Sequence, residues 1–214
     1  MLTVWGRKSS SNVQAVLWCL AELGIEHERI DAGFTYGVVD TTAYRAMNPN
    51  GTVPTIRDGD GPPLFESGAI LRYLAGRYAS GPFWPADALE RTGIDQWAEW
   101  SKLNIAQGFT GPVFWPAVRV PAARRDPAAI DRAVVELERG LSIADERLAT
   151  RAFLAGEVLT LADIQFGHIL FRYYDLKIRR AELPHLARYY RDLVKRPAYR
   201  EHVMVSYGEL ADSM

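Results

Sequence analysis

The chain has 214 residues and a formal net charge of −1 at pH 7, with 48% hydrophobic and 24% charged residues. This length suits one large or two small domains with a substantial core. The near-neutral charge gives no electrostatic reason to expect a nucleic acid or a membrane surface as a partner. A single cysteine excludes an intrachain disulfide framework, and no apolar run approaches membrane-spanning length. We therefore expect a protein of a reducing compartment, the cytoplasm.

The first 31 residues predict a strand, a helix and a second strand. Leu2–Trp5 alternates as a strand does, and apolar residues recur at helical spacing from Val13 to Leu23, ahead of the capping residue Gly24. Residues 25–31 read as the second strand, so the connection is a right-handed parallel crossover. The polar run Ser9–Asn12 directly precedes the helix.

Residues 33–78 predict the rest of a small α/β unit. Turn formers dominate residues 33–51, with a weak helix around 42–47. A short apolar strand then begins near Val53, and a Gly-Asp-Gly hairpin leads to the returning strand Leu64–Phe65. Helical spacing follows from Ser67 to about Tyr78.

Pro54 stands directly after a β-branched residue at the mouth of the third strand. Because proline cannot donate a ladder hydrogen bond, it belongs at a strand's start or edge, where an extended ligand can pair instead. A Val-Pro bond adopts the cis form at a cost of only about 0.5–1 kcal/mol. In the cis form, the carbonyl and amide of Val53 would turn outward as a peptide-binding edge.

Glu66 and Ser67 stand where the next helix begins. A helix N-terminus and the Ser67 hydroxyl suit a carboxylate, whereas Glu66 suits an ammonium group. Such a pair is appropriate for the head group of an amino acid. The alternative is that Ser67 only caps the helix and that Glu66 is only a first-turn acid.

The second half of the chain carries almost no strand signal. The segment Gly81–Pro85 breaks the pattern and predicts a domain boundary. Pro112, Pro116 and Pro121 interrupt the region between the first two predicted helices. Helices are predicted at about 88–107, 127–149, 161–174 and 184–194, with a short one near 198–203.

Thr160 and Asp163 predict a capping box at the start of one of these helices. Leu159 against Ile164 supplies the accompanying hydrophobic staple. The motif is structural, so replacing Asp163 with alanine should cost about 1 kcal/mol or more of stability and leave chemistry untouched.

Four features resemble the cytosolic glutathione transferases, and the resemblance extends over nearly the whole chain. In chain order they are the Val-Pro strand, the Gly-Asp-Gly hairpin, the Glu-Ser helix start and the helix start Thr160–Asp163. The resemblance implies an α/β plus all-α fold, with a thioredoxin-like glutathione-binding domain at 1–80, a linker at 81–88 and an all-helical domain at 89–214. It also implies a homodimer and two small-molecule partners, glutathione as co-substrate and a hydrophobic electrophile. We expect no metal, because the four histidines lack metal-ligand spacing.

The resemblance places glutathione along the backbone of Val53 and Pro54, with Glu66 and Ser67 at its γ-glutamyl end. The family often holds the glycine carboxylate with a basic or amide residue just before the Val-Pro pair, where this chain has Thr52. Asn50, Arg7 or Lys8 is expected to substitute.

The thiol donor implied by the resemblance is a serine in the loop before the first helix. Ser10 matches the catalytic serine of plant phi-type enzymes and ranks first, Ser11 matches that of insect delta-type enzymes, and Asn12 is a supporting donor. The alternative is a polar run that only caps the helix. Cys19 lies inside the helix without a partner cysteine, which predicts a buried and unreactive thiol.

The resemblance implies an electrophile pocket built from the loop after the first strand, the first long helix of the helical domain and the end of the chain. Its candidate residues are Phe34, Trp100, Asn104, Phe109, Phe114 and Trp115. The predicted function is a serine-type glutathione transferase, with peroxidase activity open to the same site. The alternatives are a glutathione-dependent isomerase, which a chiefly arginine-bearing electrophile pocket for dicarboxylic substrates would favour, and a non-enzymatic binding protein on the same fold.

Overall fold

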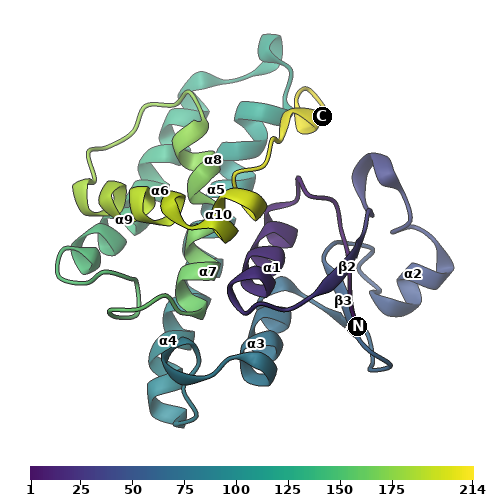
Figure 1. Ribbon diagram of the computed structural model, residues 1–214. Helices are drawn as coiled ribbons and strands as arrows, with labels where there is room; N and C mark the ends of the chain where they lie inside the picture. The colour runs from purple at the N-terminus through teal and green to yellow at the C-terminus, as the bar shows by residue number, and fades with distance from the viewer.

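The computed structural model describes residues 1–214, and its N-terminal part is built on a four-stranded sheet (Figure 1). The strands are β1 (Leu2–Trp5), β2 (His27–Ile30), β3 (Thr55–Asp58) and β4 (Leu64–Phe65). Their order is β2-β1-β3-β4, with β1 and β2 parallel and the other neighbours antiparallel. The parallel pair confirms the predicted crossover.

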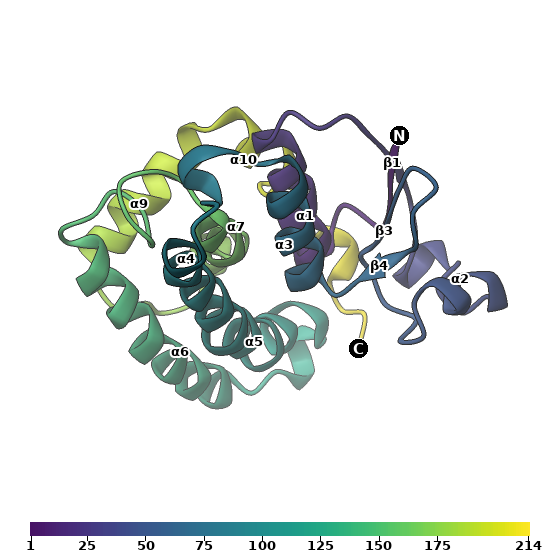
Figure 2. The ribbon, with the colours of Figure 1, turned by 90° about the horizontal axis from the view of Figure 1, so that it is seen from below.

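Helices cover both faces of this sheet. α1 (Ser11–Glu22) and α3 (Ser67–Tyr78) pack against each other on the face that meets the helical half of the molecule, and α2 (Thr42–Met47) lies on the other side (Figure 2). A short 3-10 turn, η1 (Phe34–Tyr36), precedes α2. The termini of α1 and α3 therefore lie between the sheet and the helical domain.

The rest of the chain contains only helices and loops, which confirms the predicted combination of a thioredoxin-like domain and an all-helical domain. None of the helices combines the length and the apolar character that crossing a bilayer requires. The elements after the turn η2 (Gly81–Phe83) are α4 (Ala88–Trp100), η3 (Ser101–Ala106), α5 (Gln107–Phe109), η4 (Thr110–Arg119), η5 (Ala122–Arg124), α6 (Pro127–Leu148), α7 (Leu161–Gly167), α8 (Leu170–Asp175), α9 (Pro184–Lys195), α10 (Pro197–His202) and η6 (Gly208–Leu210).

The chain stays helical from Ala88 to Arg119, so the interruption predicted from Pro112 and Pro116 is wrong. The turns η3 and η4 are wide, π-type turns, and Pro116 lies inside η4. Such turns change the hydrogen-bond pattern locally and so accommodate a residue without an amide proton. The continued helix carries residues 110–119 to the edge of the first domain.

The two domains share one core. Trp18 of α1 is fully buried and meets the ring of Tyr199 edge-on, with 4.9 Å between ring centroids. Gly167 permits this approach, because a Cβ there would lie 2.9 Å from Trp18 Cη2 and 2.8 Å from Leu193 Cδ1. Cys19 is buried beside Trp18, and burial raises the pKa of its thiol, in agreement with an unreactive residue.

The capping box at the start of α7 is present, and the Asp163 carboxylate is the centre of a larger buried network. It accepts hydrogen bonds from the Thr160 amide at 2.8 Å, the Thr160 hydroxyl at 3.0 Å, the Leu154 amide at 2.8 Å and the Tyr189 hydroxyl at 2.9 Å. Asp163 therefore joins the loop before α7 to α9.

We expect Asp163→Ala to lower the free energy of unfolding by about 2–4 kcal/mol, because it leaves several buried donors without an acceptor. Urea denaturation of the variant and of the parent protein measures this difference. The exposed Asp131→Ala on α6 is the control and should change stability by less than about 0.5 kcal/mol. Equal losses in the two variants would contradict a structural role for the network.

Candidate active site

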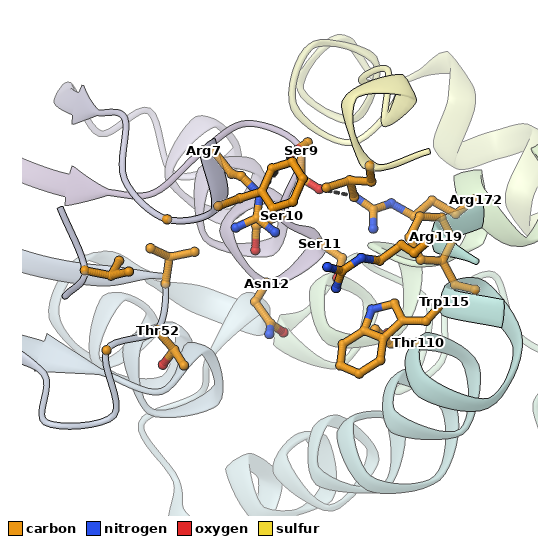
Figure 3. Close-up of a pocket in the computed structure, with 17 residues that line it drawn as sticks. Arg7, Ser9, Ser10, Ser11, Asn12, Thr52, Thr110, Trp115, Arg119 and Arg172 are labelled. Carbon is orange, nitrogen blue, oxygen red and sulfur yellow. Dashed lines mark hydrogen bonds between the residues drawn. The ribbon is translucent and has the colours of Figure 1, made fainter. Parts of the chain in front are cut away.

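A cavity of about 310 Å³ lies between the two domains (Figure 3). The first domain lines it with the loop after β1, the start of α1, residues 33–34 and residues 51–53. The helical domain contributes residues from η4 together with Arg172 of α8 and Leu210 of η6. The site therefore exists only where the two domains meet.

The serines at the start of α1 differ in how their hydroxyls are used. The Ser9 hydroxyl accepts a hydrogen bond from Arg7 Nε at 3.1 Å and donates to the Glu209 carboxylate. Ser10 is the N-cap residue, yet its side chain caps no amide, and Ser11 is the first helical residue. The hydroxyls of Ser10 and Ser11 thus remain available to a ligand in the cavity that both residues line.

The N-terminus of α1 adds unpaired amides to these hydroxyls. The first helical backbone hydrogen bond runs from Gln14 N to Ser10 O at 2.9 Å, so the amides of Ser11, Asn12 and Val13 have no helical acceptor. With the dipole of a 12-residue helix behind them, these donors favour an anion at this end of the cavity.

Asn12 is held by a bridge to the helical domain. Lys102 Nζ donates to Asn12 Oδ1 at 3.1 Å and to Ser67 Oγ at 2.8 Å, and Ser67 Oγ donates to Asn12 Oδ1 at 3.3 Å. Because an ammonium group can only donate, the contact identifies the Asn12 oxygen and leaves its Nδ2 free to donate. Burial lowers the pKa of Lys102, and the nearby carboxylates of Glu66 and Glu99 partly oppose that effect.

The start of α3 is also irregular. Glu66 is the N-cap with φ of 67°, an uncommon conformation for a side-chain-bearing residue, and its carboxylate caps no amide. Ser67 is the first helical residue rather than the cap. Ser67 is buried whereas Glu66 is exposed, so the two present a buried hydroxyl and an accessible carboxylate side by side.

The Val53-Pro54 peptide bond is cis, and Val53 makes no backbone hydrogen bond within the protein. The preceding residue, Thr52, is held by two side chains, since its carbonyl accepts hydrogen bonds from Tyr44 Oη at 2.7 Å and Asn48 Nδ2 at 2.9 Å. Helix α2 thereby supports an unpaired strand edge that lines the cavity opposite the serines.

Arginine side chains make the cavity electropositive. Arg7, Arg119 and Arg172 line it, and Figure 3 shows them gathered around Ser10 and Ser11. Arg172 is buried and donates from Nη2 to the Ser9 carbonyl at 2.5 Å, which ties α8 to the loop before α1. Burial lowers the pKa of Arg172 to about 10, so the group is still charged at pH 7.

The structure brings most of the predicted site residues together. The cavity is lined by Arg7, Ser10, Ser11, Asn12, Phe34, Val53, Phe114 and Trp115. Ser67 adjoins it through its hydrogen bond to Asn12, and Glu66 directly precedes Ser67. Pro54 is buried behind Val53, and Asn50 lies exposed at the turn before it.

Three residues predicted for the electrophile pocket do not line this cavity. Trp100 and Asn104 lie in a separate depression between η3 and α6, and the Asn104 side chain donates to the Trp100 carbonyl at 3.1 Å. Phe109 is buried in the core against Phe114 and Tyr173. The family resemblance selected these residues by their place in the chain, which does not determine which side of the helix faces the cavity.

The residues of the site that the sequence did not indicate include Lys102, Thr110, Arg119 and Arg172. A signal existed for two of them. Lys102 falls in the stripe of buried residues that includes Ala98 and Ile105, and Arg172 falls beside buried Tyr173. A charged residue on a predicted buried face is costly unless it has partners, and it therefore marks a site to examine.

Comparisons with known proteins agree with this geometry. A family model described as "Glutathione S-transferase, N-terminal domain" matches residues 9–77, and one described as "Glutathione S-transferase, C-terminal domain" matches residues 104–197. Glutathione S-transferase GstB of Escherichia coli K12 is 34% identical over 206 residues, which cover 96% of this chain and 99% of the relative.

Two further relatives differ in how much of their own length the chain covers. The crystal structure of the theta class glutathione S-transferase from Xanthomonas axonopodis pv. citri, with glutathione bound, has a TM-score of 0.90 and 42% identity over 96% of this chain and 98% of that one. Elongation factor 1-gamma of Prunus avium is 31% identical over 204 residues, which cover 94% of this chain but only 47% of that protein.

Proposed function

The chain belongs to the cytosolic glutathione transferase family, and from this membership we propose that its cavity binds glutathione and ionises the thiol for attack on an electrophile. One observation carries the proposal. Two unpaired serine hydroxyls at a helix N-terminus line the same cavity as the unpaired strand edge at Val53.

Glutathione pairs with the free amide and carbonyl of Val53 in the manner of an added strand. Its γ-glutamyl carboxylate lies at Ser67, where Lys102 Nζ is 2.8 Å from the hydroxyl, and its ammonium group lies at exposed Glu66. This orientation directs the cysteine sulfur toward Ser10 and Ser11. Arg7 Nη1 and the Val53 side chain both approach Gly33, and Arg7 is assigned to the glycine carboxylate in preference to exposed Asn50.

The site lowers the thiol pKa by stabilising the anion. An ordinary thiol has a pKa of about 8.5, and a reduction of about two units requires about 2.7 kcal/mol in favour of the thiolate. A serine hydroxyl, the amides of α1 and the arginine charges supply this preference together. Because the thiolate is the reactive form, activity rises with pH through the lowered pKa and then levels off.

The chemical step needs no covalent intermediate on the enzyme. The thiolate sulfur forms a bond to the electrophilic carbon, the leaving group departs with its electron pair, and the thiol proton has already passed to solvent. Phe34, Phe114 and Trp115 provide the surface that holds the electrophile near the sulfur. Family resemblance also supports a cytoplasmic homodimer.

A second candidate function is a glutathione-binding interaction module without catalysis. The similarity to elongation factor 1-gamma supports this alternative, because that protein carries the same kind of region within a longer chain. Such a module would bind glutathione without changing the ionisation of its thiol. The ionisation state of the bound thiol therefore separates the two functions.

We predict that glutathione bound to the protein titrates with a thiol pKa about two units below that of free glutathione, and that Ser10→Ala or Ser11→Ala removes at least half of this shift. The loss of one donor to the developing anion should lower kcat by about 10²-fold. Thiolate absorbance over a pH series, with kcat measured in parallel, tests both statements.

The exposed Ser80→Ala is the control for the titration and should keep the parent pKa. Of the two serines, Ser10 is expected to show the larger effect. A bound-glutathione thiol pKa equal to that of free glutathione in the parent protein would contradict the transferase proposal and favour the binding module.

Lys102→Met is expected to raise the dissociation constant of glutathione by about tenfold or more, because it removes charge-assisted hydrogen bonds to Ser67 and Asn12. Methionine nearly preserves the buried volume, so the fold should survive. Calorimetric titration measures the affinity, and exposed Lys177→Met is the matched control. An unchanged affinity in Lys102→Met would show that the bridge does not support glutathione binding.

A further inference from the structure

The cavity holds more positive charge than its own carboxylates neutralise. Glu209 is bound to the Ser9 hydroxyl, and its Oε1 lies 3.9 Å from Arg7 Nε. No carboxylate lies within 4.0 Å of the guanidinium nitrogens of Arg119 or Arg172, and Arg119 donates only to the Ser213 hydroxyl, at 3.0 Å. Arg119 and Arg172 therefore lack a counter-ion in the protein.

Arg172 shows this deficit most clearly. Its Nη2 is hydrogen bonded to the Ser9 carbonyl, with the Gln14 amide oxygen at 3.4 Å, whereas its Nε is buried without a hydrogen-bond partner. A buried charge without a carboxylate is costly. The nearby positive charge of Arg7 adds to the burial that already lowers the pKa of Arg172. An anion in the cavity would offset both the cost of burying the Arg172 charge and the repulsion between Arg172 and Arg7.

Aromatic rings stand beside these arginines: Arg172 Cζ lies 4.6 Å from the ring centroid of Phe114, and Arg7 Cζ lies 5.5 Å from that of Phe34. Arg119 Cζ lies 5.8 Å from the ring centroid of Phe34 and 5.5 Å from that of Trp115. Phe34 is 36% exposed and Trp115 is 41% exposed, so both rings offer open apolar surface. The rings would accept a flat apolar body, and the guanidinium groups would accept its negative charge.

We propose that the electrophile of this protein is an aromatic compound that carries a carboxylate, held by Arg119 and Arg172 while its ring lies against Phe34 and Trp115. The inference rests on the proposed transferase function and specifies its second substrate. Arg7 is assigned to glutathione, since its Nη1 approaches Gly33, the residue that the Val53 side chain also approaches. The two ligands thus use different arginines of one cavity.

A suitable probe is 4-(chloromethyl)benzoate, with 4-(chloromethyl)benzamide as its neutral counterpart. In both reactions the glutathione thiolate attacks the benzylic carbon, a C–S bond forms, and the C–Cl bond breaks with chloride taking the electron pair. The thiol proton goes to solvent. The reacting centres are alike, so a difference between the probes reports the recognition of the carboxylate.

The test compares kcat/KM for the two probes in the parent protein and in Arg119→Gln, Arg119→Lys and Arg132→Gln. The parent should prefer the carboxylate by about tenfold or more, the size expected of one charge-assisted hydrogen bond. Arg119→Gln should reduce the preference at least fivefold, and Arg119→Lys should retain part of it. Arg132, exposed on α6 outside the cavity, is the control, and its variant should keep the parent preference.

Equal kcat/KM values for the two probes in the parent protein would overturn the inference and leave the transferase function standing. An increased KM for glutathione in Arg119→Gln, with an unchanged preference between the probes, would also overturn it, because Arg119 would then hold the glycine carboxylate. Failure to turn over either probe, together with an unshifted thiol titration, would remove both the inference and the proposed function.

Discussion

The site depends on the N-terminus of α1, which is left open while the Ser9 hydroxyl and the Asn12 side-chain oxygen on either side of it are paired. On one side, the Ser9 hydroxyl is taken by Arg7 and Glu209. On the other, the Asn12 oxygen is taken by Ser67 and Lys102. The two serines between them keep free hydroxyls above free helix amides, which is the arrangement that stabilises an anion. Without the flanking contacts, the Ser9 and Asn12 side chains would be free to hydrogen bond to the two serines or to the helix amides.

This arrangement requires both domains. Lys102 reaches the Asn12 and Ser67 pair from η3, and Arg172 holds the Ser9 carbonyl from α8. Trp18 and Gly167 fix the distance between α1 and α7 by direct packing in a shared core. A thioredoxin-like domain alone would therefore lack the charges that orient its own binding loop. In the proposed function, the helical domain supplies structure to the glutathione site as well as surface for the electrophile.

The sequence predicted the parts of the fold and of the site that have local causes. Pro54 after Val53, the polar run before α1, and Thr160 with Asp163 each have a meaning that follows from neighbouring residues, and the structure has a strand edge, a helix start and a capping box there. The parts with long-range causes were not predictable in this way. Arg119 and Arg172 meet in one cavity only because the chain remains helical past Pro116. Trp100 and Phe109 were assigned by type, and their orientation depended on how the helix packs.

The central claim is that an extended tripeptide pairs with Val53 and brings its sulfur to the serines of α1. The most direct measurement is a crystal structure of the protein with bound glutathione. The account predicts hydrogen bonds between the tripeptide and the Val53 amide and carbonyl, with the sulfur within hydrogen-bonding distance of the Ser10 or Ser11 hydroxyl. Glutathione bound elsewhere, or with its sulfur directed away from both hydroxyls, would contradict it.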